Sequence, residues 1–202
     1  MIIDYCDQGT PEWRKARAGI PTASNFNRII TSKGEPSKQR EQYILELAAE
    51  AVAGPEGDGF DTYWMKRGRE LEPSAIALYE FETGNEVHSV GFVYRDDGRS
   101  AGCSPDNLAW EDGIMGGLEV KSPAPKTHVA YLLGNKLPSE YFHQVQGCMW
   151  VTGSPWWDFM SYCPGMRPLL VRALPDNQYH DALSRAMPTF LRDLDSVTDR
   201  VR

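Results

Sequence analysis

Residues 104–123, SPDNLAWEDGIMGGLEVKSP, combine the pattern of a β-hairpin with three charged side chains, those of Asp106, Glu119 and Lys121. Two apolar runs separated by turn-forming residues predict two antiparallel strands. A hairpin of this kind brings the residues before its first strand close to the end of its second strand. We therefore expect Asp106 to lie beside Glu119.

The two charges on the second strand should lie on one face, because alternate residues of a strand point to the same side. Glu119 and Lys121 share that face, and Leu118 and Val120 take the other. Two carboxylates and an ammonium group suit hard-metal chemistry, in which the carboxylates hold Mg²⁺ or Mn²⁺ and a phosphate oxygen completes the shell. The lysine can orient or deprotonate an attacking water and offset charge in the transition state. A turn acid after a proline and a solvated ion pair on a strand are the plain alternatives.

The composition predicts a single domain over residues 1–202, because 41% of the residues are hydrophobic and can build one core. No apolar run nears the roughly 20 residues that span a bilayer, and the N-terminus lacks a signal-peptide pattern. We therefore expect a cytoplasmic protein with no membrane segment. The net charge of −7 argues against a nucleic-acid partner, although cations can cancel the charge of metal-binding carboxylates. The four scattered cysteines lack the spacing of a zinc or iron–sulphur site.

The order of the predicted elements indicates an α/β (α+β) domain with a mixed central sheet flanked by helices. Helices are expected over residues 12–17, 23–30, 40–52, 62–83, 139–151 and 176–201, with an interruption at Pro73 and a break or kink near Pro188. Strands are expected over residues 86–94, 101–103, 107–110, 117–121, 156–163 and 169–174. A mobile glycine-rich connection is expected at residues 53–61.

Pro105 and Asp106, followed by Glu119, Val120 and Lys121, resemble the signature of the PD-(D/E)xK nuclease superfamily. The chain more specifically resembles the lambda-exonuclease type of phage alkaline exonuclease, the YqaJ-type viral recombinases. That likeness runs over roughly residues 11–165 through EWRKARAGIPTASNFNRII, RGRELEPSAIALYEFETG, VYRDDGRSAGCSPD, GLEVKSP and YFHQVQGCMWVTG. It implies a restriction-endonuclease-like core.

The resemblance assigns catalytic roles to residues of this signature. Asp106 and Glu119 match the metal-binding acids of the family, the Val120 carbonyl matches a further ligand, and Lys121 matches the catalytic lysine. Glu72 matches an acid that a helix brings to the second metal position. Two Mg²⁺ ions per site are implied, with Mn²⁺ as a substitute.

The resemblance also implies a pocket for the terminal 5′-phosphate of DNA, formed by Arg17, Ser24 and Ser104. A guanidinium fork and two hydroxyls suit a phosphate dianion. A further basic residue is expected after the second hairpin strand. The ungapped match falls on Thr127, between Lys126 and His128, and we expect Lys126 to serve.

Further residues are expected to act near the scissile strand. Gln144 is expected to hydrogen-bond the attacking water or the DNA backbone. The resemblance also implies an apolar wedge that splits the terminal base pairs, and Met65 matches its position, with Trp64 near enough to stack on bases. The full set of expected DNA contacts is Met65, Trp64, Lys66, Arg67, Arg69, Tyr141 and Gln146. The alternative for these residues is an ordinary amphipathic helix.

The resemblance implies an Mg²⁺-dependent exonuclease that loads on double-stranded DNA ends. It would hydrolyse one strand 5′→3′ to mononucleotides and leave a 3′ overhang for a single-strand annealing protein. A homotrimeric ring and a phage or prophage source are also implied, which places the protein in the cytoplasm of a bacterial host. The alternatives are a non-catalytic DNA-end-binding module that recruits an annealing protein, and an endonuclease or 3′→5′ nuclease of the same superfamily.

Overall fold

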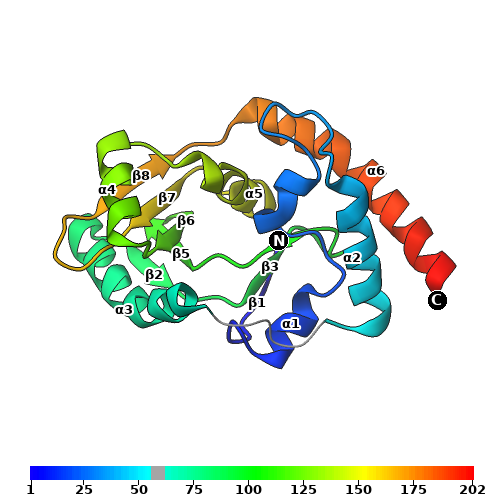
Figure 1. Cartoon of the computed structure of the whole chain (residues 1–202), viewed down its shortest axis with the longest axis horizontal. Helices are drawn as coiled ribbons and strands as arrows, with labels where there is room; N and C mark the ends of the chain where they lie inside the picture. The colour runs from blue at the N-terminus through cyan, green and yellow to red at the C-terminus, as the bar shows by residue number, and fades with distance from the viewer. Residues whose placement is uncertain (56–61) are drawn as a thin grey trace.

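The computed structural model describes residues 1–55 and 62–202, which form two β-sheets with helices packed around them (Figure 1). Residues 56–61, part of the expected glycine-rich connection, lie outside the described residues. The mixed sheet and its helices confirm the predicted fold class. Within the described ranges, every helix is too short or too polar to cross a bilayer.

The larger sheet has five strands in the order β2-β5-β6-β7-β8. Their bounds are β2 Glu86–His88, β5 Asn107–Glu111, β6 Ile114–Lys121, β7 Trp157–Ser161 and β8 Leu169–Ala173. Strands β6 and β7 are parallel, and the other neighbours are antiparallel. The register of β5 against β6 pairs Asn107 with Leu118, so the hairpin expected from residues 104–123 is confirmed.

A smaller antiparallel sheet has the order β1-β3-β4, with β1 at Ile2–Asp4, β3 at Phe92–Tyr94 and β4 at Gly102–Cys103. The single strand expected over residues 86–94 was wrong, because β2 joins the larger sheet and β3 joins the smaller one. The chain changes sheet at Gly91, where a Cβ atom would lie 2.0 Å from the Cys6 carbonyl oxygen. The N-terminal segment therefore passes close to the backbone of Gly91. The pairing of β1 with β3 could not be foreseen from the local sequence pattern.

Six α-helices and two short 3₁₀ helices surround the sheets in the described residues. They are α1 Pro11–Arg17, η1 Ala23–Arg28, α2 Arg40–Ala53, α3 Tyr63–Thr83, α4 Pro125–Gly134, η2 Ser139–Tyr141, α5 Phe142–Thr152 and α6 Asn177–Val201. The interruption expected at Pro73 and the break expected near Pro188 do not occur, because α3 and α6 continue through them. Each helix buries an apolar face, and that burial offsets the hydrogen bond that its proline removes. Helix α4 was not expected.

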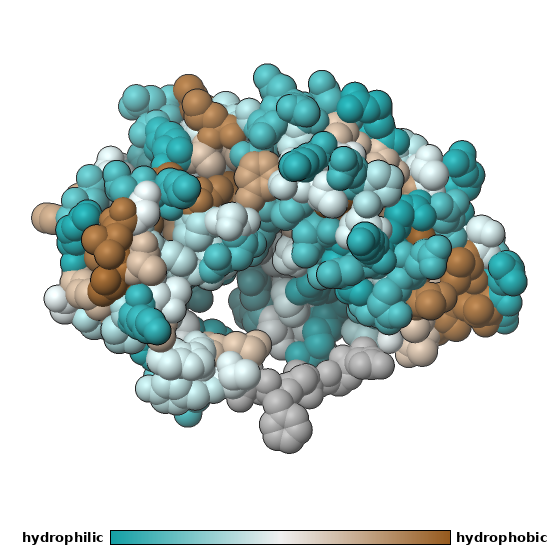
Figure 2. Space-filling model, turned by 45° about the horizontal axis from the view of Figure 1, so that its top comes forward, coloured by the Kyte–Doolittle hydropathy of each residue, from teal (hydrophilic) through white to brown (hydrophobic). Residues whose placement is uncertain are grey.

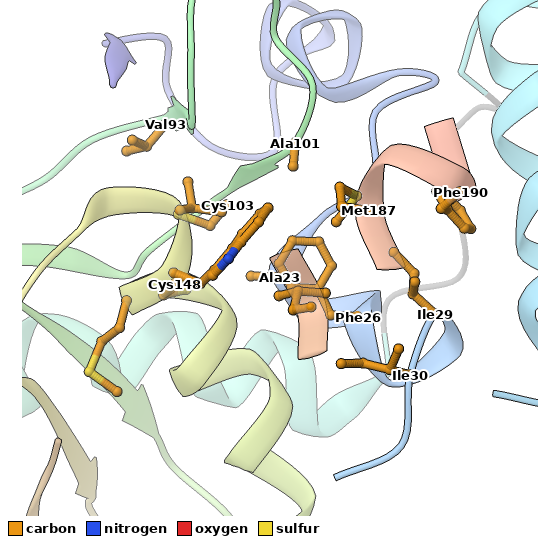
Figure 3. Close-up of a cluster of buried hydrophobic side chains, with 14 of the residues drawn as sticks. Ala23, Phe26, Ile29, Ile30, Val93, Ala101, Cys103, Cys148, Met187 and Phe190 are labelled. Carbon is orange, nitrogen blue, oxygen red and sulfur yellow. The ribbon is translucent and has the colours of Figure 1, made fainter. Parts of the chain in front are cut away.

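The main core forms where η1, α5, α6 and the smaller sheet meet (Figure 3). Phe26 of η1 packs edge-on against Trp150 of α5, with ring centroids 5.7 Å apart. A Cβ atom at Gly147 would lie 2.7 Å from the Phe26 ring, so the approach of η1 to α5 requires glycine there. This packing fixes Ser24 of η1 relative to Gln144 of α5.

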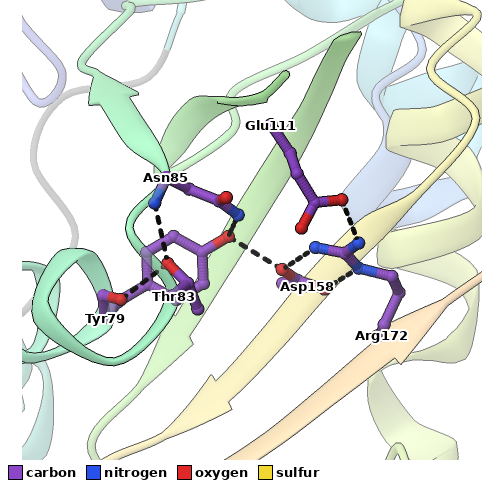
Figure 4. Close-up of polar contacts among 6 residues, drawn as sticks. All are labelled: Tyr79, Thr83, Asn85, Glu111, Asp158 and Arg172. Carbon is purple, nitrogen blue, oxygen red and sulfur yellow. Dashed lines mark hydrogen bonds and ion pairs between the residues drawn. The ribbon is translucent and has the colours of Figure 1, made fainter. Parts of the chain in front are cut away.

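A buried polar network joins α3 to the larger sheet (Figure 4). The Tyr79 hydroxyl donates to Asp158 Oδ2 at 2.8 Å and accepts from Asn85 Nδ2 at 2.9 Å. Arg172 donates through Nε and Nη2 to the two oxygens of Asp158, each at 2.9 Å, and it also pairs with Glu111. Since Tyr79 and Asp158 are almost fully buried, the network holds α3 at a fixed place on the sheet.

Replacing Tyr79 with phenylalanine should lower the free energy of unfolding by about 2 kcal/mol, because a buried amide and a buried carboxylate each lose a hydrogen-bond partner. Urea denaturation measures the change. Tyr63→Phe is the matched control, since Tyr63 is 72% exposed and the loss of its hydroxyl should cost little. Equal midpoints for the two variants would show that the network adds no stability.

Candidate active site

Three charged side chains converge at the end of strand β6. Asp106 precedes β5 and its Oδ2 accepts the Val120 N–H at 2.7 Å, which holds this carboxylate against β6. The Lys121 ammonium lies 3.7 Å from Asp106 Oδ2 and contacts Glu119 Oε1 directly. Both carboxylates therefore share one ammonium group, as the predicted hairpin requires. Leu118 and Val120 pack on the other face of the strand, against α3 and β7 residues.

Glu119 is completely buried, which is unusual for a carboxylate. Gln144 Nε2 donates to its Oε1 at 2.6 Å, whereas its Oε2 has no hydrogen-bond partner among the described residues. Burial, together with the nearby Asp106, raises the pKa of Glu119 to about 7, and Lys121 only partly opposes this. A buried carboxylate oxygen without a partner is a place where a cation would be stabilised.

Lys121 remains an ammonium group in this setting. Burial lowers its pKa, but Asp106 and Glu119 together outweigh burial and raise the pKa above the ordinary value. The Tyr141 ring lies 5.7 Å from Lys121 Nζ and covers the ammonium from the side of η2. The lysine is thus held as a donor that points at both acids.

A cavity of about 410 Å³ opens in front of these groups. Its lining residues are Trp64, Met65, Gly68, Glu72, Asp106, Val120, Lys121, Ser122, Pro123 and Tyr141. Helix α3 therefore brings Glu72 to the same cavity as Asp106, and burial, followed by the charge of Asp106, raises the pKa of Glu72. Within the described residues, no group of three or more His, Cys, Asp or Glu side chains is arranged so that it could hold a metal ion.

The first turns of α3 border this cavity with apolar and basic residues. Trp64 and Met65 are about half exposed, at 49% and 53%, and both line the cavity. Lys66 and Arg69 are exposed. Arg67 joins α3 to the end of β6, because its Nη1 donates to the Ser122 and Pro123 carbonyls at 3.0 and 3.2 Å. Its expected DNA contact stays a prediction.

A second cavity of about 200 Å³ gathers the residues expected to bind the 5′-phosphate. Its lining residues are Gln8, Trp13, Arg17, Thr22, Ala23, Ser24, Ser104, Gln144 and Cys148. No described residue accepts a hydrogen bond from the Arg17 guanidinium, whose Cζ lies 4.4 Å from the centroid of the Trp13 ring. Burial lowers the pKa of Arg17, while Tyr43 and Glu50 partly oppose this. Gln144 lines this cavity and bonds Glu119, so the two sites adjoin.

Three sequence-based candidates lie elsewhere. Lys126 is exposed in the first turn of α4 and lines neither cavity. The His128 ring is fully buried and bonds Ser161 Oγ and the Arg167 carbonyl, so it serves the core. Gln146, which was expected to contact DNA, is only 4% exposed and lines neither cavity.

The Gln146 amide connects α5 to the segment that follows β8. Its Nε2 donates to the Leu174 carbonyl at 2.9 Å, and its Oε1 accepts the Asp176 N–H at 2.8 Å. Gln144 and Gln146 are two residues apart, so they point to different sides of a helix.

Trp13 lines the smaller cavity but was not among the residues expected there from the sequence. The signal was its spacing, since it lies four residues before Arg17 and therefore on the same face of α1.

The chain matches a family model and several solved structures, exonucleases among them. The model of the YqaJ-like viral recombinase domain matches residues 12–155. The alkaline exonuclease LHK-Exo from Laribacter hongkongensis is 31% identical, with a TM-score of 0.81, and the match covers 95% of this chain and 96% of that one. LHK-Exo in complex with dAMP gives a TM-score of 0.82 at the same identity and coverage.

A more distant structure shares the fold. The phage-related exonuclease from Haemophilus somnus 129PT is 15% identical, with a TM-score of 0.68, over 91% of this chain and 96% of that one. A comparison with curated proteins finds no match. Because the family model matches more than half of the chain and LHK-Exo matches nearly all of it, the chain belongs to the YqaJ-like viral recombinase family.

Proposed function

We propose that this chain is an exonuclease that loads on a linear double-stranded DNA end and hydrolyses one strand 5′→3′, releasing mononucleotides and leaving a 3′ overhang. The observation that carries the proposal is the pair of adjoining cavities. Arg17, Ser24 and Ser104 line one of them. Asp106, Glu72 and Lys121 line the other, and the buried Glu119 contacts Lys121. The similarity to LHK-Exo, an alkaline exonuclease, supports the reaction class.

Divalent cations are the second part of the proposal. Asp106 and Glu119, with the Val120 carbonyl, would hold Mg²⁺, and Glu72 would contribute to a second ion; Mn²⁺ would substitute. The residues fit such ions, because Glu119 Oε2 is buried without a partner in the described part of the chain, and carboxylate oxygens are the ligands that hard cations prefer. When bound, the cations would polarise the phosphate and lower the pKa of water.

The side chains of this protein supply the remaining functions. Lys121, held as an ammonium group, donates hydrogen bonds that can orient the attacking water and offset charge on the phosphate. Gln144 fixes the Glu119 carboxylate through Oε1. Trp64 and Met65 present half-exposed apolar surface at the edge of the cavity, where they could separate and stack on the terminal bases.

A hydrophilic concave surface suits a polyanionic duplex. Figure 2 shows one face of the molecule hollowed near its centre and bordered mainly by hydrophilic residues.

The direction of digestion rests on the smaller cavity. Wild-type protein should digest a linear duplex with 5′-phosphates faster than the same duplex with 5′-hydroxyls. Arg17→Ala should reduce this preference by about tenfold or more, because a guanidinium–phosphate hydrogen bond contributes about 1.5–3 kcal/mol. Rates of nucleotide release on the two duplexes measure the effect. Lys15→Ala is the control, since Lys15 lies exposed on the same helix and outside the cavity.

Equal rates of wild-type protein on both duplexes would contradict the proposed polarity and favour an endonuclease or a 3′→5′ nuclease. Tight binding to ends without any strand loss would favour an end-binding module that recruits an annealing protein. The single-strand annealing partner and the homotrimeric ring stay predictions of the resemblance. The mass of the protein in solution tests the ring.

A further inference from the structure

Trp13 of α1 contacts two of the residues that form the smaller cavity. Its indole Nε1–H donates to Ser104 Oγ at 2.9 Å and also to the Gly91 carbonyl at 3.1 Å. Its ring lies under the Arg17 guanidinium, with Arg17 Cζ 4.4 Å from the ring centroid. Trp13 itself lines the cavity and is partly buried. One side chain thus connects α1 with the segment that leads to Asp106.

The hydrogen bond from Trp13 fixes the direction in which Ser104 can donate. An indole N–H is a donor only, so it occupies a lone pair of Ser104 Oγ and leaves the hydroxyl proton for another acceptor. None of the described residues accepts that proton, and Ser104 lines the cavity. A carboxylate or carbonyl in the place of the indole would have turned the proton away from the cavity. The indole therefore makes Ser104 a donor toward a bound anion.

The stacking contact has a second consequence, for Arg17. A carboxylate partner would occupy the donors of the guanidinium, whereas an aromatic face holds the plane of the group and leaves its N–H donors unused. In the described residues, those donors have no hydrogen-bond partner. The Trp13 ring thus holds the Arg17 guanidinium in place while the N–H groups of Arg17 remain available to an anion.

We infer that Trp13 is a positioning residue that sets the specificity for phosphorylated 5′ ends, by turning Ser104 into a donor and by holding the Arg17 guanidinium open. This inference rests on the proposed function, because it concerns the anion that the smaller cavity would bind. The ligand is a terminal phosphate monoester of DNA. The role of Trp13 is indirect, through Ser104 and Arg17.

The variant Trp13→Phe separates the two contacts, since it keeps an aromatic ring under Arg17 and removes the N–H. On a 5′-phosphorylated duplex, it should raise the apparent KM for DNA ends by about tenfold with little change in kcat. On a 5′-hydroxyl duplex, its KM should equal that of the wild type. In the background of Ser104→Ala, the same change should add no further loss, because the N–H then has no hydroxyl to orient. Trp110→Phe, on β5 and outside both cavities, is the control and should leave both values unchanged.

The outcomes distinguish this inference from the proposed function. If the wild type prefers phosphorylated ends and Trp13→Phe keeps the full preference, the inference is wrong and the proposed function stands. If the variant loses activity equally on both duplexes, or if its effect adds fully to that of Ser104→Ala, Trp13 is only structural. If the wild type treats both ends alike, the proposed end recognition fails, and the role of Trp13 fails with it.

Discussion

Replacing Lys121 with alanine is expected to lower the rate of strand hydrolysis on a linear duplex by about a thousandfold or more in the presence of Mg²⁺. The Lys121 ammonium contacts Glu119 and lies 3.7 Å from Asp106, in the cavity where the phosphate would bind. Without it, the attacking water loses a donor that orients it, and the charge that develops on the phosphate loses its nearest fixed cation. Release of nucleotides from a 5′-phosphorylated duplex measures the rate.

The control for this experiment is Lys136→Ala, which removes an exposed lysine outside both cavities. It should retain the wild-type rate. Binding of the Lys121→Ala variant to duplex ends should persist, because Arg17 and Ser24 are intact and lie in the other cavity. Hydrolysis by Lys121→Ala at the wild-type rate would exclude the proposed catalytic role. A loss of end binding as large as the loss of rate would instead indicate a folding defect.

The arrangement of Asp106, Glu119 and Lys121 could be predicted from the sequence because its geometry is local. A hairpin fixes its own register through its turn, and alternation then decides which side chains share a face. The positions of Asp106, Glu119 and Lys121 relative to one another can therefore be predicted from residues 104–121 alone. The polar pattern within a buried strand was the informative signal, since charges are rarely buried without a function or a partner.

The smaller sheet and the contacts that depend on distant segments could not be predicted in the same way. Strand β1 has three residues, and three α-helices separate it in the sequence from β3, with which it pairs. The contacts of Arg67 and Gln146 with the backbone carbonyls of Ser122 and Leu174 were not foreseen, whereas their expected contacts with DNA stay predictions. Nothing in the local pattern of a helix tells which backbone groups will lie opposite it.

The second large effect is expected from Glu119→Gln, which should lower the rate of hydrolysis by about a thousandfold or more and should also remove a binding site for cations. The amide has nearly the shape of the carboxyl group, so the buried site keeps its packing and its bond to Gln144. It carries no charge, however, and binds Mg²⁺ or Mn²⁺ poorly. The shift of the thermal midpoint on adding either cation reports binding without any need for activity.

Wild-type protein should become more stable as the cation is added, by about 2.7 kcal/mol when the concentration is a hundred times Kd. Glu119→Gln should show little of this gain, and Glu86→Gln, an exposed acid on the same sheet, should show all of it. Lys121→Ala should also keep the gain, because it removes an ammonium and leaves both acids in place. The variants at positions 119 and 121 of β6 thus distinguish the loss of cation binding from the loss of hydrolysis with the cation still bound. A cation-induced gain in Glu119→Gln equal to that of the wild type would show that Glu119 is not a ligand.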